Sequence, residues 1–292
     1  MKKKFKLFNN RPYLSDKIIF SVVFVFFTVY AISLLYPFFW AFMSSLKTPS
    51  EYFRDAFALP QDWLFSNYGT ALSQLEANGV SFWQMTWNSL WYTGAAIAVS
   101  IFILSLFSYT VAKYNFRMRP FLIGLNMFLM LIPIMGSMPA AYRLYHTYGI
   151  VNSPIFVIVT STGGFGANFL ILTSYYRNLS WSYAEAALID GANDFTVYFR
   201  IMLPMAMGPL SCMILTAFIG RWNDYLTPLM YLESYPTLSS GLYTYRQISV
   251  ERFGTYPVFF AGALVSMLPV LVLYTAFHKT IMENLLGGGL KE

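Results

Sequence analysis

The fold is decided by the stretch Glu185-Ala186-Ala187-Leu188-Ile189-Asp190-Gly191, which continues to Ile201-Met202-Leu203-Pro204. Four long apolar runs precede this polar stretch and two follow it. Its small alanines favour a helix and leave a low surface that a partner can approach closely. Gly191 permits the positive φ of a turn into a second helix, and Pro204 lies near the start of the next apolar run, where a missing backbone N–H does little harm. The stretch therefore predicts a water-exposed helix-turn-helix between membrane spans.

The composition is that of an integral membrane protein. Hydrophobic residues make up 57% of the 292 residues and charged residues only 11%, against about 25% charged in soluble domains. The net charge of +6 comes from short basic clusters beside apolar runs, which is the positive-inside pattern and not the stripe of a nucleic-acid-binding protein. Cys212 is alone, so an intrachain disulfide and a cysteine metal cluster are excluded, and no metal site is expected.

Six apolar runs are long enough to cross a membrane, given that a helix needs about 20 residues for a core of ~30 Å. They cover residues 18–46, 85–112, 120–142, 153–176, 201–225 and 257–277. We therefore expect an all-α membrane protein: a single transmembrane domain, 1–292, with six transmembrane helices. The helix-turn-helix falls between spans four and five.

The distribution of basic residues predicts the topology. The proposed inner segments hold 13 of the 19 Lys and Arg residues, and the proposed outer segments hold 6. Because cytoplasmic segments are enriched in Lys and Arg, we expect both termini to be cytoplasmic. The same rule makes 1–17 a cytoplasmic arm and 177–200 a cytoplasmic loop, with outer loops at 47–84 and 226–256.

The spacing of the polar stretch resembles the EAA loop of ABC-importer permeases. That pattern is E-A-A, three residues, G, nine residues, I, any residue, L-P, and every fixed position is matched here. In the family this cytoplasmic helix-turn-helix docks on an ATPase subunit. The resemblance implies that Glu185 contacts a basic residue of the ATPase, beside Ala186 and Ala187, and that Gly191 forms the turn. Asp190 is either a second contact or a cap of the turn, and the alternative for the whole stretch is an ordinary amphipathic surface helix.

Two further stretches resemble carbohydrate-uptake permeases of the maltose-transporter type. The run from Arg221 to Leu229, R-W-N-D-Y-L-T-P-L, resembles W-N-D-[FY]-L-x-P-L. The run from Thr237 to Leu242, T-L-S-S-G-L, resembles T-L-P-x-G-L, with Ser239 in place of the usual proline. The resemblance implies a permease subunit of an ATP-driven importer of sugars or oligosaccharides in a bacterial or archaeal cytoplasmic membrane. It also implies partners: a sister permease forming a heterodimer, two ATPase subunits and an extracytoplasmic sugar-binding protein, besides membrane lipid.

The chain is expected to be neither an enzyme nor a cofactor-binding protein. Gly163-Gly164-Phe165-Gly166 is not a phosphate loop, because no Gly-Lys-Ser/Thr follows it. ATP and Mg²⁺ are therefore expected on the partner ATPase. Paired carboxylates, a histidine metal motif and an activated nucleophile are also absent from the sequence.

A secondary carrier driven by an ion gradient is the alternative function. Such carriers hold ionisable residues in mid-membrane, where each costs at least about 2.5–3.5 kcal/mol and is kept for function. No such residue falls in the central part of any predicted span. The sequence therefore favours the importer.

Polar and aromatic residues at the outer end of span five are candidates for the substrate pathway. They are Trp222, Asn223 and Asp224. Trp222 and Tyr225 fit equally well as anchors at headgroup depth. Asn223 and Asp224 need polar partners near a membrane boundary, and Arg221 is close in sequence.

The second outer loop carries candidates for contact with a binding protein. They are Tyr243, Tyr245 and Arg246. One interpretation is a solvated loop with interfacial tyrosines. The other, implied by the resemblance, is a loop that enters the cleft of the binding protein, where tyrosines stack on apolar sugar faces.

Overall fold

The structure is a computed structural model that describes residues 14–132, 136–250 and 254–287. Most of the predicted arm 1–17 lies outside these ranges. Within them the chain is mostly helical. Its four longest helices are α1 (Leu14–Ser45), α4 (Phe82–Lys113), α12 (Met207–Trp222) and α16 (Tyr256–Gly287).

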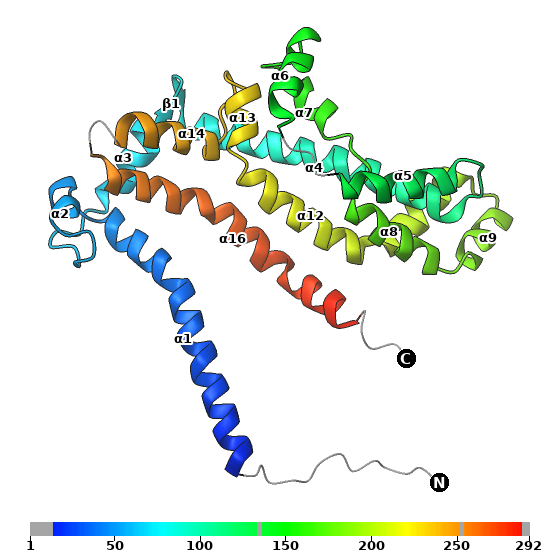
Figure 1. Ribbon diagram of the computed structural model, residues 1–292, viewed down its shortest axis with the longest axis horizontal. Helices are drawn as coiled ribbons and strands as arrows, with labels where there is room; N and C mark the ends of the chain where they lie inside the picture. Colours follow the sequence, from blue (N-terminus) through cyan, green and yellow to red (C-terminus); the bar gives the residue numbers. More distant parts are fainter. Residues whose placement is uncertain (1–13, 133–135, 251–253, 288–292) are drawn as a thin grey trace.

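Helix α4 lies at the centre of the body (Figure 1). It packs along α8 (Ala167–Asn178) and α12, and α16 packs against α12 and α1. The buried side of α4 carries small or hydroxyl side chains: Ser89, Thr93, Ala96, Ser105, Ser108 and Ala112. Such residues let membrane helices approach closely and form hydrogen bonds across the contact. The sequence of α4 therefore suits a helix surrounded by other helices.

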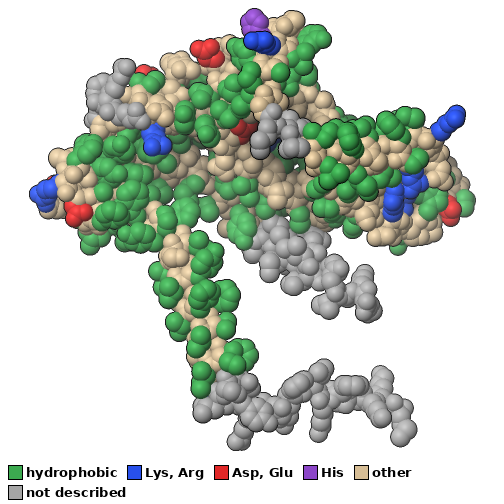
Figure 2. Space-filling view, in the orientation of Figure 1, with side chains coloured by type: hydrophobic (Ala, Val, Ile, Leu, Met, Phe, Trp, Pro, Cys, Tyr) green, Lys and Arg blue, Asp and Glu red, His purple; other side chains and the backbone are tan. Residues whose placement is uncertain are grey.

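Helix α1 leaves the body along most of its length (Figure 1). The side chains of residues 17–39 are exposed, and Figure 2 shows an almost unbroken hydrophobic surface along this helix. A helix that is apolar all round is stable only in an apolar environment. The exposed part of α1 therefore needs lipid or another protein chain around it.

The described residues support three membrane spans, or four. Lys17–Ser45, Phe82–Lys113 and Tyr256–Phe277 are each long and apolar enough to cross a membrane. A fourth candidate is the pair Asp194–Met205 and Met207–Trp222, whose axes differ by 74°. Predicted spans one, two and six thus have counterparts as single helices, and span five has one as a bent pair.

Predicted spans three and four are not single helices. In place of 120–142 the chain forms α5 (Arg119–Leu131) and α6 (Met138–Thr147). In place of 153–176 it forms α7 (Ile155–Thr160) and α8, separated by residues 161–166. Gly136 and Gly166 have φ of +71° and +127°, a region that breaks a helix and favours glycine. The six-span count remains a prediction.

A short hairpin departs from the predicted all-α fold. Strand β1 (Glu76–Ala77) pairs antiparallel with β2 (Val80–Ser81). Asn78 and Gly79 between them have φ of +54° and +75°, the backbone of a two-residue hairpin turn that Asn-Gly favours. This hairpin is the one strand pair among the described residues, in a chain that is otherwise helical as predicted, and the Asn-Gly pair was its signal in the sequence.

The predicted outer loops are folded and hold short helices. In 47–84 these are α2 (Pro49–Arg54) and α3 (Ser66–Gln74), and α4 already begins at Phe82. In 226–256 they are α13 (Leu226–Tyr231), α14 (Leu238–Tyr245) and the π-helix η2 (Arg246–Val250). Residues 251–253 of the second loop lie outside the described ranges.

Candidate functional site

The predicted helix-turn-helix is present. Helix α9 (Ser182–Ile189) ends where the Gly191 N–H donates to the carbonyl of Leu188 at 3.1 Å and the Ala192 N–H donates to that of Ala187 at 2.9 Å. This pair of bonds is a Schellman motif, which needs a left-handed residue just after the helix. Gly191 supplies it with φ of +84°, so the predicted positive φ is confirmed.

The second helix is capped by Asn193. Its Oδ1 accepts from the Thr196 N–H at 2.8 Å, and α10 (Asp194–Val197) follows. This is the side-chain cap that satisfies the first free N–H groups of a helix. Asp190, the other predicted cap, is exposed. Its carboxylate has no hydrogen-bond partner among the described residues.

A π-helical turn precedes Pro204. The turn η1 (Tyr198–Met202) follows α10 and leads into α11 (Leu203–Met205). The Leu203 N–H donates to the carbonyl of Tyr198, five residues back. Because proline has no N–H and crowds the carbonyl four residues earlier, a wider turn relieves the conflict. Pro204 therefore lies within a continuous helical segment rather than at its beginning.

The tip of this unit presents apolar side chains to solvent. Ile189 is 86% exposed and Phe195 is 72% exposed, while Glu185, Ala186 and Asp190 are also exposed. Ala184, on the other side of α9, is fully buried. Exposed apolar groups rimmed by charge are typical of a protein-binding surface. Ile189 and Phe195 were missed in the sequence, where their signal was their position inside a polar segment.

The C-terminal end of α4 holds the unit in place. The Lys113 Nζ donates to the carbonyl of Leu179 and lies 5.9 Å from the centre of the Trp181 ring. The Tyr114 hydroxyl donates to Asp194 Oδ1 at 2.8 Å. Burial raises the pKa of the Tyr114 phenol, which therefore stays protonated and continues to donate. No pattern in the sequence connects these residues.

Three buried hydroxyls join α4, α8 and η1 behind α9. Ser105 Oγ and the Tyr176 hydroxyl are 2.8 Å apart, and the Tyr198 hydroxyl donates to Ser105 Oγ at 2.9 Å. All three side chains are buried. Buried interhelical hydrogen bonds fix how helices pack, so the π-turn after α10 is connected directly to the central helix.

Trp222 and Asp224, from the second candidate set, have partners inside the chain. Trp222 is 3% exposed, and its Nε1 donates to the carbonyl of Ser266 at 3.0 Å. Asp224 accepts from the Tyr92 hydroxyl at 2.9 Å and from the Thr227 N–H at 3.0 Å. Arg221 lies 4.0 Å from the same carboxylate, which supplies the nearby partner that the sequence predicted.

The third candidate set is divided. Tyr245 is 9% exposed, with its hydroxyl donating to Thr255 Oγ1 at 3.3 Å. Arg246 is exposed at the start of η2, and Tyr243 is exposed on α14. The Tyr243 ring stacks on that of Tyr225 with centroids 4.8 Å apart. The structure thus places Tyr243 of the third set against the residue that follows the second set, a contact that their separation in sequence did not reveal.

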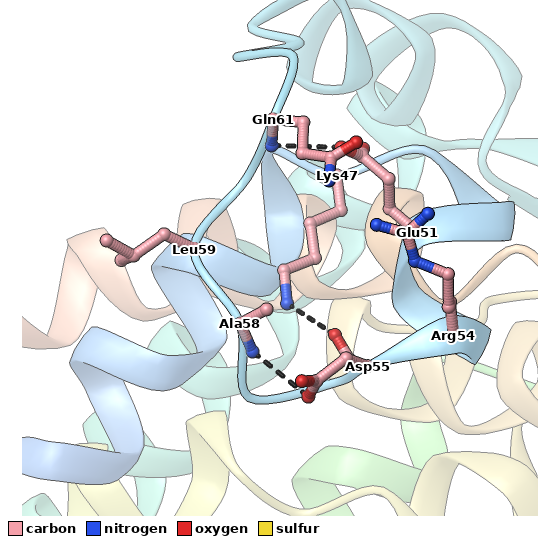
Figure 3. A pocket seen from close by; sticks show the side chains of 7 residues that line it. All are labelled: Lys47, Glu51, Arg54, Asp55, Ala58, Leu59 and Gln61. Carbon is pink, nitrogen blue, oxygen red and sulfur yellow. Dashed lines mark hydrogen bonds between the residues drawn. The ribbon is translucent and has the colours of Figure 1, made fainter.

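Two cavities lined by described residues do not suit a sugar. One encloses about 20 Å³, room for one water at most. It lies beside α2, where Glu51 Oε1 accepts from the Gln61 N–H at 2.9 Å and the buried Lys47 donates to the carbonyl of Asp55 at 3.0 Å. Figure 3 shows its lining: Lys47, Glu51, Arg54, Asp55, Ala58, Leu59 and Gln61.

A larger groove between α4 and α12 is about 250 Å³ in volume. Its lining is apolar apart from Ser105 and Tyr198, so it offers few partners for sugar hydroxyls. Within the described ranges no group of three or more His, Cys, Asp or Glu side chains is placed to hold a metal.

Known proteins resemble this chain over most of its length. It is 28% identical over 275 residues to a probable ABC transporter permease protein, YurM, of Bacillus subtilis (strain 168), covering 92% of this chain and 88% of that protein. It is 27% identical over 264 residues to the diacetylchitobiose uptake system permease protein NgcG of Streptomyces coelicolor, covering 89% and 85%.

A solved structure has the same fold. It is the crystal structure of a bacterial ABC transporter involved in the import of the acidic polysaccharide alginate. One of its chains superposes with a TM-score of 0.77 at 26% identity, covering 94% of this chain and 99% of that one.

The family model described as binding-protein-dependent transport system inner membrane component matches residues 105–281. That range includes the whole helix-turn-helix, the Trp222–Asp224 segment and α14. The chain belongs to this family of binding-protein-dependent inner membrane transport components.

Proposed function

We propose that this chain is a permease subunit of an ATP-driven importer of sugars or oligosaccharides, and that it couples to a separate ATPase through α9. The relatives support a sugar as the substrate, because NgcG is named for the uptake of diacetylchitobiose and the solved transporter for the import of a polysaccharide. The observation that carries the coupling is the exposed apolar tip at Ile189 and Phe195 beside Glu185.

The docking surface consists of the exposed side of α9 and the following turn. Glu185 supplies the charge contact, and Ala186 and Ala187 let the partner approach closely. Gly191 fixes the angle between the two short helices, and the Asp190 carboxylate is free to make a second contact. A carboxylate that enters a cationic cleft of an ATPase loses water on docking, so its pairing is stronger than a surface contact.

ATP and Mg²⁺ belong to the partner in this proposal, and two ATPase copies serve two permease subunits. Closure of the ATPases moves α9, and the contacts of α10 and η1 with α4 and its C-terminal end carry that movement into the bundle. Movement of one packed bundle against another gives alternating access.

The sister permease covers α1 in this proposal. The side chains of 17–39 are exposed and apolar on all sides, which suits a helix embraced partly by a second transmembrane chain and partly by lipid. The predicted topology follows from this arrangement. We propose a bacterial or archaeal cytoplasmic membrane as the location, with α9 and both termini in the cytoplasm and 47–84 and 226–256 outside.

The outer side receives a binding protein that delivers the sugar. We assign contact with it to Arg246, which is exposed at the start of η2. Tyr245 supports this contact from within, because it is packed and bonded to Thr255. The substrate path runs beside the C-terminal end of α12. Trp222 and Asp224 hold the backbone there in place, and Asn223 is exposed beside the path.

Reconstitution tests this function. The complex is purified through a tag on this chain, its other chains are identified by mass spectrometry, and it is placed in vesicles with the binding protein in excess. Uptake of labelled maltotriose, diacetylchitobiose and arabinotriose is then measured with and without ATP. We expect a second permease and an ATPase to co-purify and ATP to drive uptake of at least one sugar. Uptake that needs an ion gradient and no ATP would contradict the proposal.

A further inference from the structure

Two exposed side chains alternate with two anchored ones at the C-terminal end of α12. Trp222 and Asp224 are held by Ser266 and Tyr92, as described above. Asn223 and Tyr225, in between and just after, are exposed, and Tyr225 is 42% exposed. Anchors on both sides fix the backbone of this segment. The amide and the phenol ring are therefore presented in one orientation at little entropic cost.

Helix α14 is bonded to the same segment through Ser239. Ser239 Oγ donates to the carbonyl of Trp222 at 2.5 Å, and the Leu238 N–H donates to Ser89 Oγ on α4 at 2.7 Å. A proline, usual at position 239 in the pattern that this stretch resembles, has no hydroxyl to make the first bond. These two bonds set the position of α14, and with it Tyr243, whose ring lies 4.8 Å from that of Tyr225 at an angle of 23°.

The segments that carry the stacked pair are bonded to the N-terminal third of α4, at Ser89 and Tyr92. This helix has 32 residues, about 48 Å at 1.5 Å per residue. When it is centred on a core of ~30 Å, about 9 Å projects at each end. Tyr92, which holds Asp224, lies ten residues after Phe82, about 15 Å from the start of the helix. The end of α12 that Tyr92 holds is therefore about 6 Å inside the edge of such a core, at the outer mouth of a path through the bundle.

The chemistry of the surface is neutral and suits hydroxyls. The side chain of Arg221 lies beside Asp224, so the two charges compensate each other. The hydroxyls of Tyr225 and Tyr243, and Oδ1 of Asn223, have no hydrogen-bond partner among the residues that the structure describes. Exposed aromatic rings pack on the apolar C–H faces of sugars, and free hydroxyl and amide groups form hydrogen bonds with sugar hydroxyls.

We propose that Asn223, Tyr225 and Tyr243, with Arg221 at the edge, form a contact surface for an uncharged saccharide ring on its way through the membrane. This inference rests on the proposed function, since it needs a sugar in the path. A loop of the binding protein is the other occupant to consider. The experiment below separates the two, because a contact with the binding protein would change stimulated ATP hydrolysis as well as uptake.

The test compares uptake with ATP hydrolysis in the reconstituted complex. The sugar is the one taken up by the wild-type complex from the panel of maltotriose, diacetylchitobiose and arabinotriose. The double variant Tyr225→Leu/Tyr243→Leu removes both rings, while Tyr225→Phe keeps the ring and removes one hydroxyl. Tyr148→Leu is the matched control, because Tyr148 is 72% exposed at the end of α6, away from this surface.

We expect the double variant to hydrolyse ATP in response to the loaded binding protein as the wild type does, with uptake per ATP lowered about five- to tenfold. That range corresponds to the loss of about 1–1.4 kcal/mol of ring contact. Tyr225→Phe should lose less, and Tyr148→Leu should lose nothing. If the double variant does not assemble, Asn223→Ala is measured in its place. Uptake per ATP should then fall about threefold, because one hydrogen bond to the sugar is lost.

Three results would overturn the inference. One is an unchanged uptake per ATP in the double variant, or in Asn223→Ala where that variant replaces it. A second is an equal fall in uptake and in stimulated hydrolysis, which would assign the surface to the binding protein. The third is an equal fall in Tyr148→Leu. A wild-type complex that takes up no sugar with ATP would instead overturn the proposed function, so the two failures are distinguishable.

Discussion

The two ends of α4 are held in different ways. At the C-terminal end, Lys113 and Tyr114 reach a small unit whose tip is exposed and apolar. At the N-terminal end, Asn88 donates to the carbonyl of Pro236 at 3.0 Å, and Ser89 and Tyr92 bond α14 and the end of α12. The first end is bonded to a unit with an exposed apolar tip, and the second is bonded to α14 and the end of α12 through buried side chains. In the proposed function, the first end receives the ATPase and the second carries α13 and α14 along with the bundle.

In the proposed function, this difference gives α4 a role in coupling. A single continuous helix is stiff along its axis, so displacement at one end is passed to the other. The exposed unit at α9 has the freedom to be displaced, while the bonds at Asn88, Ser89 and Tyr92 oblige α13 and α14 to follow. The predictions below perturb the two ends separately, and they should produce different losses.

The largest effect is expected at Gly191. Its φ of +84° is strained for any side chain, and a β-branched residue there costs about 1–3 kcal/mol. Gly191→Val should insert in the membrane normally yet lose most of its co-purifying ATPase. Gly69→Val is the matched control, because Gly69 lies in α3 with open space around a Cβ and no positive φ. Full recovery of ATPase with Gly191→Val would show that the turn does not set the docking geometry.

At the opposite end, removal of Asp224 should affect stability and leave docking intact. Asp224→Ala leaves the phenol of Tyr92, a residue 1% exposed, without its 2.9 Å acceptor, at a cost of about 1–3 kcal/mol. We expect a lower melting temperature of the detergent-solubilised chain with normal ATPase co-purification. The double variant Asp224→Ala/Tyr92→Phe should recover part of the loss, since it removes both partners. A loss of ATPase with normal stability would reverse the assignment of the two ends.

A smaller effect is expected for the bond between α4 and α10. Tyr114→Phe removes the 2.8 Å bond to Asp194, worth about 0.5–1.5 kcal/mol. The ATPase should still bind, because the docking surface is unchanged. Hydrolysis should continue with less uptake per ATP, since the unit is held less firmly to α4. Unchanged coupling in Tyr114→Phe would show that this contact does not transmit movement.

The smallest effect concerns the loop around α2. Hydrogen bonds, first from the Thr48 backbone N–H, hold the pKa of Glu51 below its ordinary value of 4.5. A carboxyl whose folded pKa is depressed contributes stability above the unfolded pKa, and that contribution is lost as pH falls through the folded pKa. Proteolysis of 47–62 should therefore increase below about pH 4. Glu51→Gln should remove most of this pH dependence, and an identical pH profile in that variant would exclude Glu51 as the cause.

The sequence predicted the parts that depend on local chemistry. The helix over Glu185 to Ile189 and the positive φ of Gly191 follow from residue types and spacing, and the structure has both. The place of this unit between spans four and five stays a prediction. The three long helices followed from uninterrupted apolar runs. The interruptions in α5–α6 and α7–α8 were not predicted, because apolar length does not show where glycines adopt positive φ.

The contacts between segments that are distant in the sequence could not be predicted from it. The stack of Tyr225 on Tyr243 depends on where Ser239 and Ser89 fix α14, and residue types alone do not reveal such pairing. The same limit applies to Trp222, whose motif suggested an exposed anchor or substrate contact and whose ring is buried. A π-turn before Pro204 likewise depends on how η1 packs against α4.

Charge reversal at Glu185 tests the central claim most directly. Loss of one partner of a desolvated pair typically costs about 2–5 kcal/mol, and a lysine adds repulsion. Glu185→Lys should therefore lose the ATPase on purification and lose ATP-dependent sugar uptake in vesicles, and an acidic substitution at the facing basic residue of the ATPase should partly restore both. Glu233→Lys, an equally exposed reversal near α13, should change neither. If Glu185→Lys binds the ATPase and transports sugar at the wild-type rate, α9 is not the coupling element.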